Sequence, residues 1–308
     1  MNASGASGES QEVNRGYSVA GGRAIAPPLA PGLHVVATPI GNLKDITLRA
    51  LETLAAADTI LAEDTRQTAK LLQRYAIRTP LKPYHEHNAE AMRPRLLERL
   101  RAGAALALVS DAGTPLVSDP GVKLVRDALD AGVAVHPVPG PSAALAALVA
   151  SGLMGERFLF AGFPPSKRQA RRRFLQDLAD ENATIVLFES PHRVRDTLND
   201  MVDIFGPRRE AAACRELTKL HEEVLRGPLA DLAHQLAARQ RVRGEFTLVV
   251  APPVKRPAQA SDEAVRAALA EALEHQPAGK AAAQVARRFG LKKRALYDLA
   301  VRLSQEGK

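Results

Sequence analysis

The 308-residue chain contains a single cysteine, Cys214, and no tryptophan. One cysteine excludes an internal disulfide and any metal site built from several cysteines, and it fits a reducing compartment. No apolar run approaches the ~20 residues that a membrane-spanning helix needs. The first thirty residues also lack the apolar segment of a secretory signal peptide. These absences predict a cytoplasmic protein that does not enter a membrane.

Acidic residues are fewer than basic ones, 34 against 42, which leaves a formal net charge of +8. This balance permits a polyanionic partner, although a basic proteome or a general effect on solubility explains the charge nearly as well. Hydrophobic residues make up 46% of the chain and charged residues 25%, as in ordinary globular proteins. The length suits two modest domains with additional tails.

Residues 1–32 are rich in Gly, Ser, Ala and Pro without periodicity, which predicts a disordered tail. From residue 33 to 153, strand-like and helical patterns alternate, which predicts an α/β domain with a mostly parallel sheet. The expected strands are 33–38, 59–62, 104–109 and 133–138. The expected helices are 48–57, 65–75, 89–102, 122–131 and 142–152.

A second α/β domain is predicted over 154–252, with the boundary near 152–155. Its strand-like runs are denser, so we expect a mixed sheet with antiparallel pairs. The expected strands are 157–161, 183–188, 211–217, 222–226 and 245–251. A Pro-rich linker over 253–261 leads to a small all-helical domain over 262–308.

Polar motifs follow the predicted strands, and none of them resembles GxGxxG. They are "TPIGNLKDITLRAL" (38–51), "AEDTRQT" (62–68), "SDAGTPLVSDPG" (110–121), "VPGPSAAL" (138–145), "FESPHR" (188–193), "CRELTKLHE" (214–222) and "RGEFTLVV" (243–250). Each one alone is explained by a tight turn or a helix cap. In open α/β sheets, however, ligands bind beyond the carboxyl ends of strands. Together the motifs predict a ligand cleft between the two α/β domains.

The stretch "YHEHN" (84–88) places two histidines around Glu86. This is a weak pattern for zinc, because no second cluster of cysteine or histidine lies nearby in the sequence. We interpret these histidines as structural or as substrate contacts, and we expect no metal.

The motifs "ATPIGNLKDIT", "AEDTR", "HEHN", "SDAGTP…SDPG", "PGPSA", "FESPHR", "RELTK" and "GEFTLV" occur in this order. In this respect the chain resembles the bacterial 16S rRNA (cytidine-2′-O)-methyltransferases of the tetrapyrrole methylase superfamily. The resemblance covers about 33–252, and the segment after 262 is similar to the small helical C-terminal domain of that family. It implies two α/β domains that bind S-adenosylmethionine (SAM) between them, in a homodimer.

The same resemblance implies an RNA-binding transferase that acts in rRNA processing and methylates a cytidine ribose of 16S rRNA in the small ribosomal subunit. According to this resemblance, "SDAGTP" forms part of the SAM site, and the other strand-end motifs line the rest of it. The implied cofactor-binding residues are Pro39, Gly41, Ser110, Asp111, Ala112, Gly113, Thr114, Asp119, Ser142, Ala143, Glu189, Leu217 and Thr218.

Methyl transfer to a 2′-hydroxyl needs alignment of the oxygen with the methyl carbon and a group that accepts the hydroxyl proton. The candidates for that base, or for the groups that orient it, are Asp64, Glu189, His192 and Lys219. Arg66 and Arg193 are expected to bind the adjacent phosphate, because guanidinium suits bidentate phosphate contact.

Two basic stretches are candidate RNA contacts. "SKRQARRR" (166–173) contributes Lys167, Arg168, Arg171, Arg172 and Arg173, and "QVARRFGLKKRALY" resembles a helix-turn-helix with Gly290 at the turn. A solvated helix face or simple helix packing would also explain them.

Two other functions fit parts of the sequence. A methylase of a tetrapyrrole or another small molecule would need neither basic stretch. A DNA-binding ligand sensor would use the helix-turn-helix segment, but it would not explain the strand-end motifs of both α/β domains.

Overall fold

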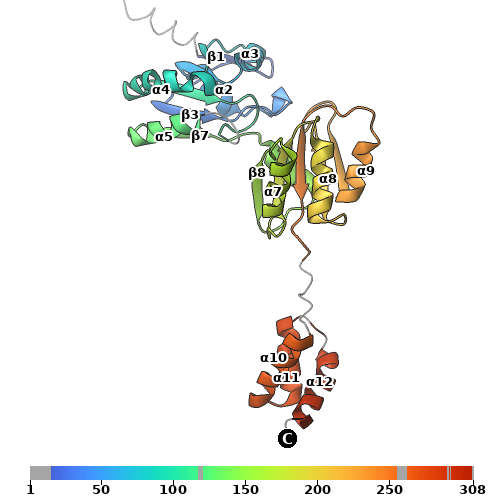
Figure 1. Cartoon of the computed structure of the whole chain (residues 1–308). Coiled ribbons are helices and arrows are strands. Elements are labelled where there is room, and N and C mark those ends of the chain that lie inside the picture. The colour runs from blue at the N-terminus through green and yellow to red at the C-terminus, as the bar shows by residue number, and fades with distance from the viewer. Residues whose placement is uncertain (1–14, 117–120, 255–261, 290, 292, 307–308) are drawn as a thin grey trace, which may run out of the picture. The chain divides into compact units, whose positions relative to one another are not determined.

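The computed structural model describes residues 15–116, 121–254, 262–289, 291 and 293–306. The chain divides into two compact units, Met1–Pro252 and Pro253–Lys308, and each is described separately (Figure 1). No helix in the described part of the chain is long and apolar enough to cross a membrane.

The first sheet of the larger unit has the strand order β5-β4-β6-β3-β7. All its pairs are parallel, in agreement with the mostly parallel sheet that was predicted. The central strands are apolar and completely buried, which is typical of parallel sheets that are covered on both faces. The strands are β3 (Gly32–Val36), β4 (Thr59–Ala62), β5 (Leu81–Pro83), β6 (Ala105–Val109) and β7 (Val135–Val138). The short edge strand β5 was not expected from the sequence.

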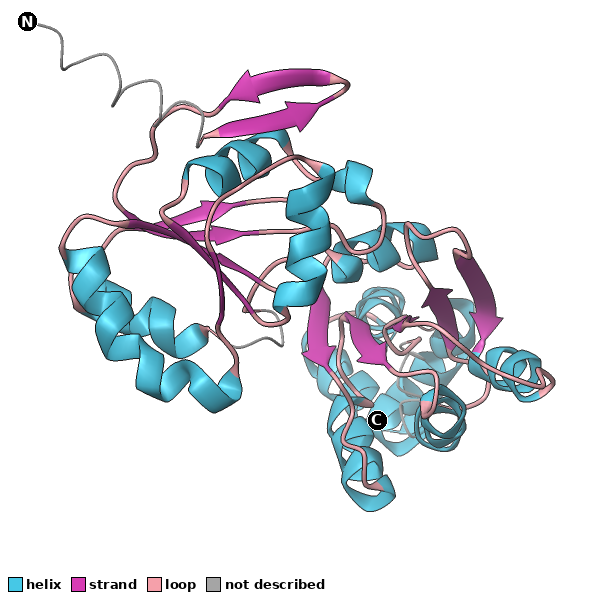
Figure 2. Cartoon of the chain, turned by 90° about the horizontal axis from the view of Figure 1, so that it is seen from above, coloured by secondary structure: helices cyan, strands magenta, loops and turns pink. Residues whose placement is uncertain are grey.

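Helices cover both faces of this sheet (Figure 2). Alternate residues of β4 face opposite cores, because successive strand side chains point to opposite sides. Ile60 packs with α2 (Leu48–Ala56) and α3 (Thr65–Arg74), whereas Leu61 packs with α4 (Glu86–Arg101) and α5 (Val122–Asp130). A short 3₁₀ helix, η1 (Leu43–Asp45), precedes α2.

The prediction of a disordered tail up to residue 32 is wrong for the described residues 15–32. They include an antiparallel hairpin of β1 (Gly16–Val19) and β2 (Gly22–Ile25), visible in Figure 2. Ala20 and Gly21 have φ values of 51° and 82°, which suit a two-residue hairpin turn. Tyr17 and Ala26 are buried in the core beside α2 and α3, and the amide of Ser18 donates to the carbonyl of Tyr75, so several contacts anchor this segment. Residues 1–14 lie outside the described residues.

The second sheet is mixed, as predicted, with the order β11-β10-β12-β9-β8. Only the β8–β9 pair is parallel, and the other pairs are antiparallel. The strands are β8 (Phe158–Gly162), β9 (Thr184–Glu189), β10 (Glu210–Arg215), β11 (Glu223–Pro228) and β12 (Phe246–Val250).

One face of the second sheet is covered by α7 (Arg168–Leu178), α8 (Val194–Phe205) and α9 (Leu229–Ala237). The opposite face packs against α6 (Ala143–Ser151), which follows the last strand of the first sheet. Small residues make this possible, since Ala144 and Ala147 let the helix approach the sheet closely.

Helix α6 therefore ties the two sheets into one unit. The domain boundary predicted near 152–155 assigns α6 to the first domain, but the helix packs on the second sheet.

The smaller unit consists of α10 (Asp262–His275), α11 (Ala278–Phe289) and α12 (Lys293–Glu306). The helices share a core of alanine, leucine and valine side chains, including Leu269, Val285 and Leu296. A helical C-terminal segment was predicted, but Gly290, expected at the turn, lies outside the described residues.

Candidate active site

The strand-end motifs of the larger unit share one cavity of about 480 Å³. This volume lies within the ~300–1,000 Å³ range of typical ligand pockets. Both sheets contribute to it. The lining residues are Ile40, Glu63, Asp111, Ala112, Gly113, Thr114, Ser142, Ala143, Phe163, Phe188, Glu189, Ser190, Pro191, Cys214, Leu217, Glu245, Phe246 and Thr247.

A smaller cavity of about 370 Å³ adjoins the first. Both cavities are lined by Ile40, Asp111, Ala112 and Glu245, so these residues mark the junction. The smaller cavity is more polar. Its further lining residues are Thr38, Pro39, Gly41, Leu43, Gln67, Thr68, Lys70, Leu71, Ser110 and Lys219.

Backbone pairing connects the loops after β3 and β6. The amide of Thr38 donates to the carbonyl of Gly113 at 2.9 Å, and the amide of Gly113 donates back at 3.0 Å. The Thr38 hydroxyl also donates to the carbonyl of Ser110 at 3.2 Å. Gly113 has a φ of +79°, a conformation that suits glycine and explains its place in "SDAGTP".

The loop 215–219, "RELTK", is strained. Glu216 and Thr218 have φ values of 50° and 65°, which non-glycine residues adopt only at an energetic cost. Contacts from other strand-end loops hold this conformation. The amide of Glu245 donates to Glu216 Oε1 at 2.9 Å, and the amide of Asn42 donates to Thr218 Oγ1 at 3.1 Å.

Gly41 allows this contact between the loops of the two sheets. A Cβ at this position would collide with the Lys219 side chain and lie 3.1 Å from Thr218 Oγ1. The glycine of "TPIGN" is therefore explained by close approach to "RELTK".

Acidic groups dominate the charge of the larger cavity. Among its described lining residues are four carboxylates, from Glu63, Asp111, Glu189 and Glu245, and no lysine or arginine. Glu189 and Glu245 are ion-paired, so the uncompensated negative charge comes from Glu63 and Asp111. Such a site favours a ligand that carries positive charge and disfavours phosphate.

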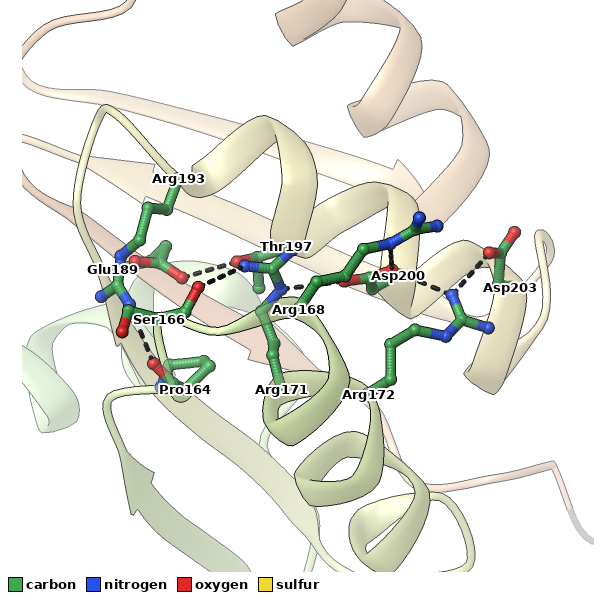
Figure 3. A network of polar contacts seen from close by, with 10 residues as sticks. All are labelled: Pro164, Ser166, Arg168, Arg171, Arg172, Glu189, Arg193, Thr197, Asp200 and Asp203. Carbon is green, nitrogen blue, oxygen red and sulfur yellow. Dashed lines mark hydrogen bonds and ion pairs between the residues drawn. The ribbon is translucent and has the colours of Figure 1, made fainter.

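Glu189 lines the larger cavity and also holds together the elements around it (Figure 3). Its side chain is completely buried, and Oε1 forms an ion pair with Arg193 Nη2 at 2.9 Å. Oε2 accepts a hydrogen bond from the Thr197 hydroxyl at 2.6 Å. Arg193 Nη1 also donates to the carbonyl of Pro164 at 3.1 Å, so the pair fixes the loop that carries Phe163.

The basic stretch 166–173 was a candidate RNA contact, but its residues Arg171 and Arg172 are engaged in close ion pairs within the fold. Arg171 is buried, and its Nε donates to Asp200 Oδ2 at 2.8 Å (Figure 3). Arg172 Nη1 binds Asp200 Oδ1 at 2.9 Å and Asp203 Oδ2 at 2.7 Å. Helical periodicity is the reason, since Arg171 lies on the same face of α7 as the buried Leu175.

Lys167, Arg168 and Arg173 remain exposed on this helix, although Arg168 also lies 3.6 Å from Asp200.

Two of the four candidate bases are unsuited to accept a proton. The hydrogen bond from Arg66 lowers the pKa of Asp64, which caps α3 and accepts the amide of Arg66 at 2.8 Å. Burial alone would lower the pKa of Lys219, but its hydrogen bonds to Glu245 and Glu216 raise it on balance. Lys219 is therefore held as a cation in the wall of the smaller cavity.

The structure brings most of the predicted cofactor residues together. The larger cavity is lined by Asp111, Ala112, Gly113, Thr114, Ser142, Ala143, Glu189 and Leu217. The smaller one includes Pro39, Gly41 and Ser110. Thr218 lines neither cavity but supports their loops, and Asp119 lies outside the described residues.

Four of the predicted catalytic residues, Asp64, Arg66, His192 and Arg193, line neither cavity.

Sequence reasoning passed over several cavity-lining residues. Glu63 belongs to the motif "AEDTRQT", in which the sequence pattern favours the neighbouring Asp64 as a candidate base. Phe163 lies in "FAGFPP", directly after a strand. A position at the end of a strand is also what identified the other cavity-lining loops. Its ring lies 5.5 Å from that of Phe188, and the two provide an aromatic surface.

His85 and His87 have ring centroids 5.9 Å apart. Within the described residues, no group of three or more histidine, cysteine, aspartate or glutamate side chains could hold a metal ion.

Comparisons with known proteins agree with this architecture. A family model described as tetrapyrrole (corrin/porphyrin) methylases matches residues 32–233, and a model described as the RsmI C-terminal HTH domain matches 259–304. The fold is similar to that of uroporphyrin-III C-methyl transferase from Thermus thermophilus complexed with S-adenyl homocysteine. That match has a TM-score of 0.50 and 21% identity, and it covers 73% of this chain and 99% of the other.

The chain is a member of the tetrapyrrole methylase family. Its curated relatives narrow the assignment. It is 50% identical to ribosomal RNA small subunit methyltransferase I of Mesorhizobium japonicum, over 88% of this chain and 92% of the relative. It is 44% identical to the protein of the same name from Synechocystis sp., over 89% and 99%. The chain therefore belongs to the ribosomal RNA small subunit methyltransferase I family, whose members are SAM-dependent rRNA methyltransferases.

The ion pairs of Asp200 generate a stability prediction. Replacing Asp200 with Asn leaves the buried Arg171 guanidinium without a counter-charge, so the free energy of unfolding should fall by about 3–5 kcal/mol. Urea denaturation at neutral pH measures this loss. The exposed Asp177→Asn on α7 is the matched control and should unfold like the wild type.

The loss should depend on pH. Burial would raise the pKa of Asp200, but hydrogen bonds from Arg172 and Arg171 outweigh it and lower the pKa. The stabilisation is therefore complete above the ordinary aspartate pKa and is lost as the pH falls through the lower folded-state value. A loss that is equally large in strong acid would contradict this account.

Proposed function

We propose that the protein transfers the methyl group of SAM to the ribose 2′-oxygen of a cytidine in 16S rRNA. Family membership supports the reaction class. The observation that carries the assignment within the structure is the larger cavity, which is acidic and partly aromatic and has no lysine or arginine among the lining residues that the structure describes. A sulfonium compound carries the positive charge that such a cavity favours, whereas nucleotide phosphates do not.

We propose the larger cavity as the SAM site. Phe163 and Phe188 would contact the adenine ring, and Asp111 would face the cationic part of the donor. Ser142 and Ala143 begin α6, and the positive end of a helix suits a carboxylate such as that of the methionine moiety. The remaining proposed contacts are Pro39, Gly41, Ser110, Ala112, Gly113, Thr114, Asp119, Glu189, Leu217 and Thr218.

We propose the smaller cavity as the entry for the acceptor nucleotide. It adjoins the larger cavity at Asp111, and its walls carry Lys70 and Lys219, whose positive charges suit a ribose–phosphate backbone. The exposed Arg66 lies on the same helix as Lys70 and supplies a further phosphate contact.

SAM supplies an activated methyl group, so most of the protein's contribution is to orient the hydroxyl and to exclude water.

The C-terminal unit offers a second RNA contact. Arg287, Arg288, Lys293 and Arg294 are exposed around the end of α11 and the start of α12, and Tyr297 is exposed beside them. Basic side chains attract the phosphates of a polynucleotide, and an aromatic side chain beside them offers a surface on which a base can stack.

We also propose a homodimer in the cytoplasm, where its rRNA substrate lies. The apolar side chains of Leu145 and Val149, one turn apart on α6, are 51% and 70% exposed. Exposed apolar groups at helical spacing fit a subunit interface.

The methylation itself is tested by mapping ribose methylation in small-subunit rRNA from cells with and without the gene for this chain. Mass mapping should show one cytidine ribose methylation that disappears on deletion and returns with the purified protein and SAM. An unchanged methylation pattern would refute the proposed function.

Deleting residues 262–308 should weaken RNA binding while SAM binding stays unchanged. The slope of log K against log salt should decrease by about one for each phosphate that the shortened protein no longer neutralises. Fluorescence anisotropy with a 16S fragment measures both effects. A full-length variant with alanine at Arg287, Arg288, Lys293 and Arg294 tests whether the loss of affinity comes from these charges or from the loss of the whole helical unit. Equal RNA affinity of the truncated and the full-length protein would contradict the assignment of the C-terminal unit as an RNA contact.

The dimer is tested by sedimentation. The wild type should sediment at twice the chain mass of 33.0 kDa, and Val149→Arg should sediment as a monomer because a charge cannot be buried there without a partner. Leu129→Arg on α5, equally exposed and apolar, is the control and should remain dimeric. A monomeric wild type at high concentration would exclude the interface.

A further inference from the structure

Glu63 was not among the predicted catalytic residues, but it lies where the first sheet meets the larger cavity. It follows the completely buried strand β4, and it lines the larger cavity. The strand fixes its backbone, while the side chain is only partly buried. Asp111, which lines both cavities, is close enough to influence its charge, so Glu63 lies near the junction of the proposed donor and acceptor sites.

The other carboxylates of the larger cavity are already engaged. Glu189 accepts hydrogen bonds from Thr197 and the Ser190 amide and pairs with Arg193. Glu245 forms an ion pair with Lys219 at 2.8 Å, and its side chain is 79% exposed.

Asp111 Oδ1 accepts the amide of Asp64 at 2.8 Å. By contrast, no described residue donates a hydrogen bond to the carboxylate of Glu63 or forms an ion pair with it.

The surroundings of Glu63 favour its protonated form. Burial raises the pKa of Glu63, and the neighbouring carboxylates of Asp111, Glu86 and Asp64 raise it further, whereas His85 opposes them. A carboxylate whose pKa is raised toward neutrality accepts a proton more readily than an ordinary glutamate.

The Nδ1 atom of His85 is itself buried without a hydrogen-bond partner. His85 influences the charge of Glu63, but no hydrogen bond or ion pair joins these two described side chains.

We propose that Glu63 is the general base of methyl transfer, accepting the proton of the ribose 2′-hydroxyl as the oxygen attacks. This assignment rests on the proposed function. The O–H bond breaks and its proton moves to the Glu63 carboxylate. The oxygen pair forms the O–CH₃ bond, and the electrons of the S–CH₃ bond stay on sulfur. The products are the 2′-O-methyl ribose, neutral S-adenosylhomocysteine and protonated Glu63, which releases its proton to solvent.

The test compares Glu63→Gln with the wild type in single-turnover transfer from radiolabelled SAM to small-subunit RNA. The variant keeps the size of the side chain but cannot accept the proton. The rate should fall by about 100-fold or more at saturating substrates, while calorimetry gives an unchanged Kd for SAM. Glu98→Gln, an exposed change on α4, should retain the wild-type rate.

The pH profile separates chemistry from structure. The base must be deprotonated, so the wild-type rate should rise with pH through the pKa of Glu63 and then level off. Glu63→Gln should lack that rise. If Glu63→Gln fails to fold, Glu63→Asp, which keeps a carboxylate, should show the rise shifted in pH with a reduced rate.

A rate near that of the wild type in Glu63→Gln, or an unaltered pH profile in Glu63→Asp, would overturn the assignment of the base. A wild type that methylates no ribose in the small subunit would instead overturn the proposed function.

Discussion

The backbone pairing of Thr38 with Gly113 holds together the wall that both cavities share. The two residues follow neighbouring parallel strands, so their loops emerge at the same edge of the sheet. The pairing closes the gap between these loops, and Gly41 then lets the first loop touch the strained "RELTK" loop of the second sheet. Polar residues that are far apart in the sequence are thereby held around one small volume.

The charges of this volume are divided between two roles. Glu189 is buried against Arg193, and its contribution is to fix α8 and the loop of Phe163. Within the described residues, neither Glu63 nor Asp111 forms an ion pair, so both leave negative charge in the cavity. A protein with a net charge of +8 thus keeps an acidic cavity, which we propose as the site of the cationic donor, while its exposed basic residues are the proposed RNA contacts.

Much of this arrangement follows from the sequence. Alternating apolar segments predicted both sheets, because a parallel sheet has continuous buried strands and a mixed one has denser short strands. The strand-end motifs predicted most of the cavity wall, because carboxyl ends of parallel strands meet at one edge.

The errors have equally specific causes. Composition hid the β1–β2 hairpin, which is anchored by a few apolar side chains such as Tyr17 and Ala26 in a segment rich in Gly, Ala and Pro. A charge run does not reveal that Arg171 faces Asp200, since the partner lies on another helix. Neighbouring acidic residues cannot be ranked without the strand, which sends Glu63 into the cavity and leaves Asp64 to cap α3.

The central claim is that a methyl donor lies in the cavity formed by the loops of both sheets. A crystal structure of the protein with S-adenosylhomocysteine tests it most directly. We expect the sulfur atom near the junction marked by Asp111, with the adenine ring against Phe163 or Phe188. A ligand bound elsewhere, or a cavity left empty at saturating ligand, would contradict the account.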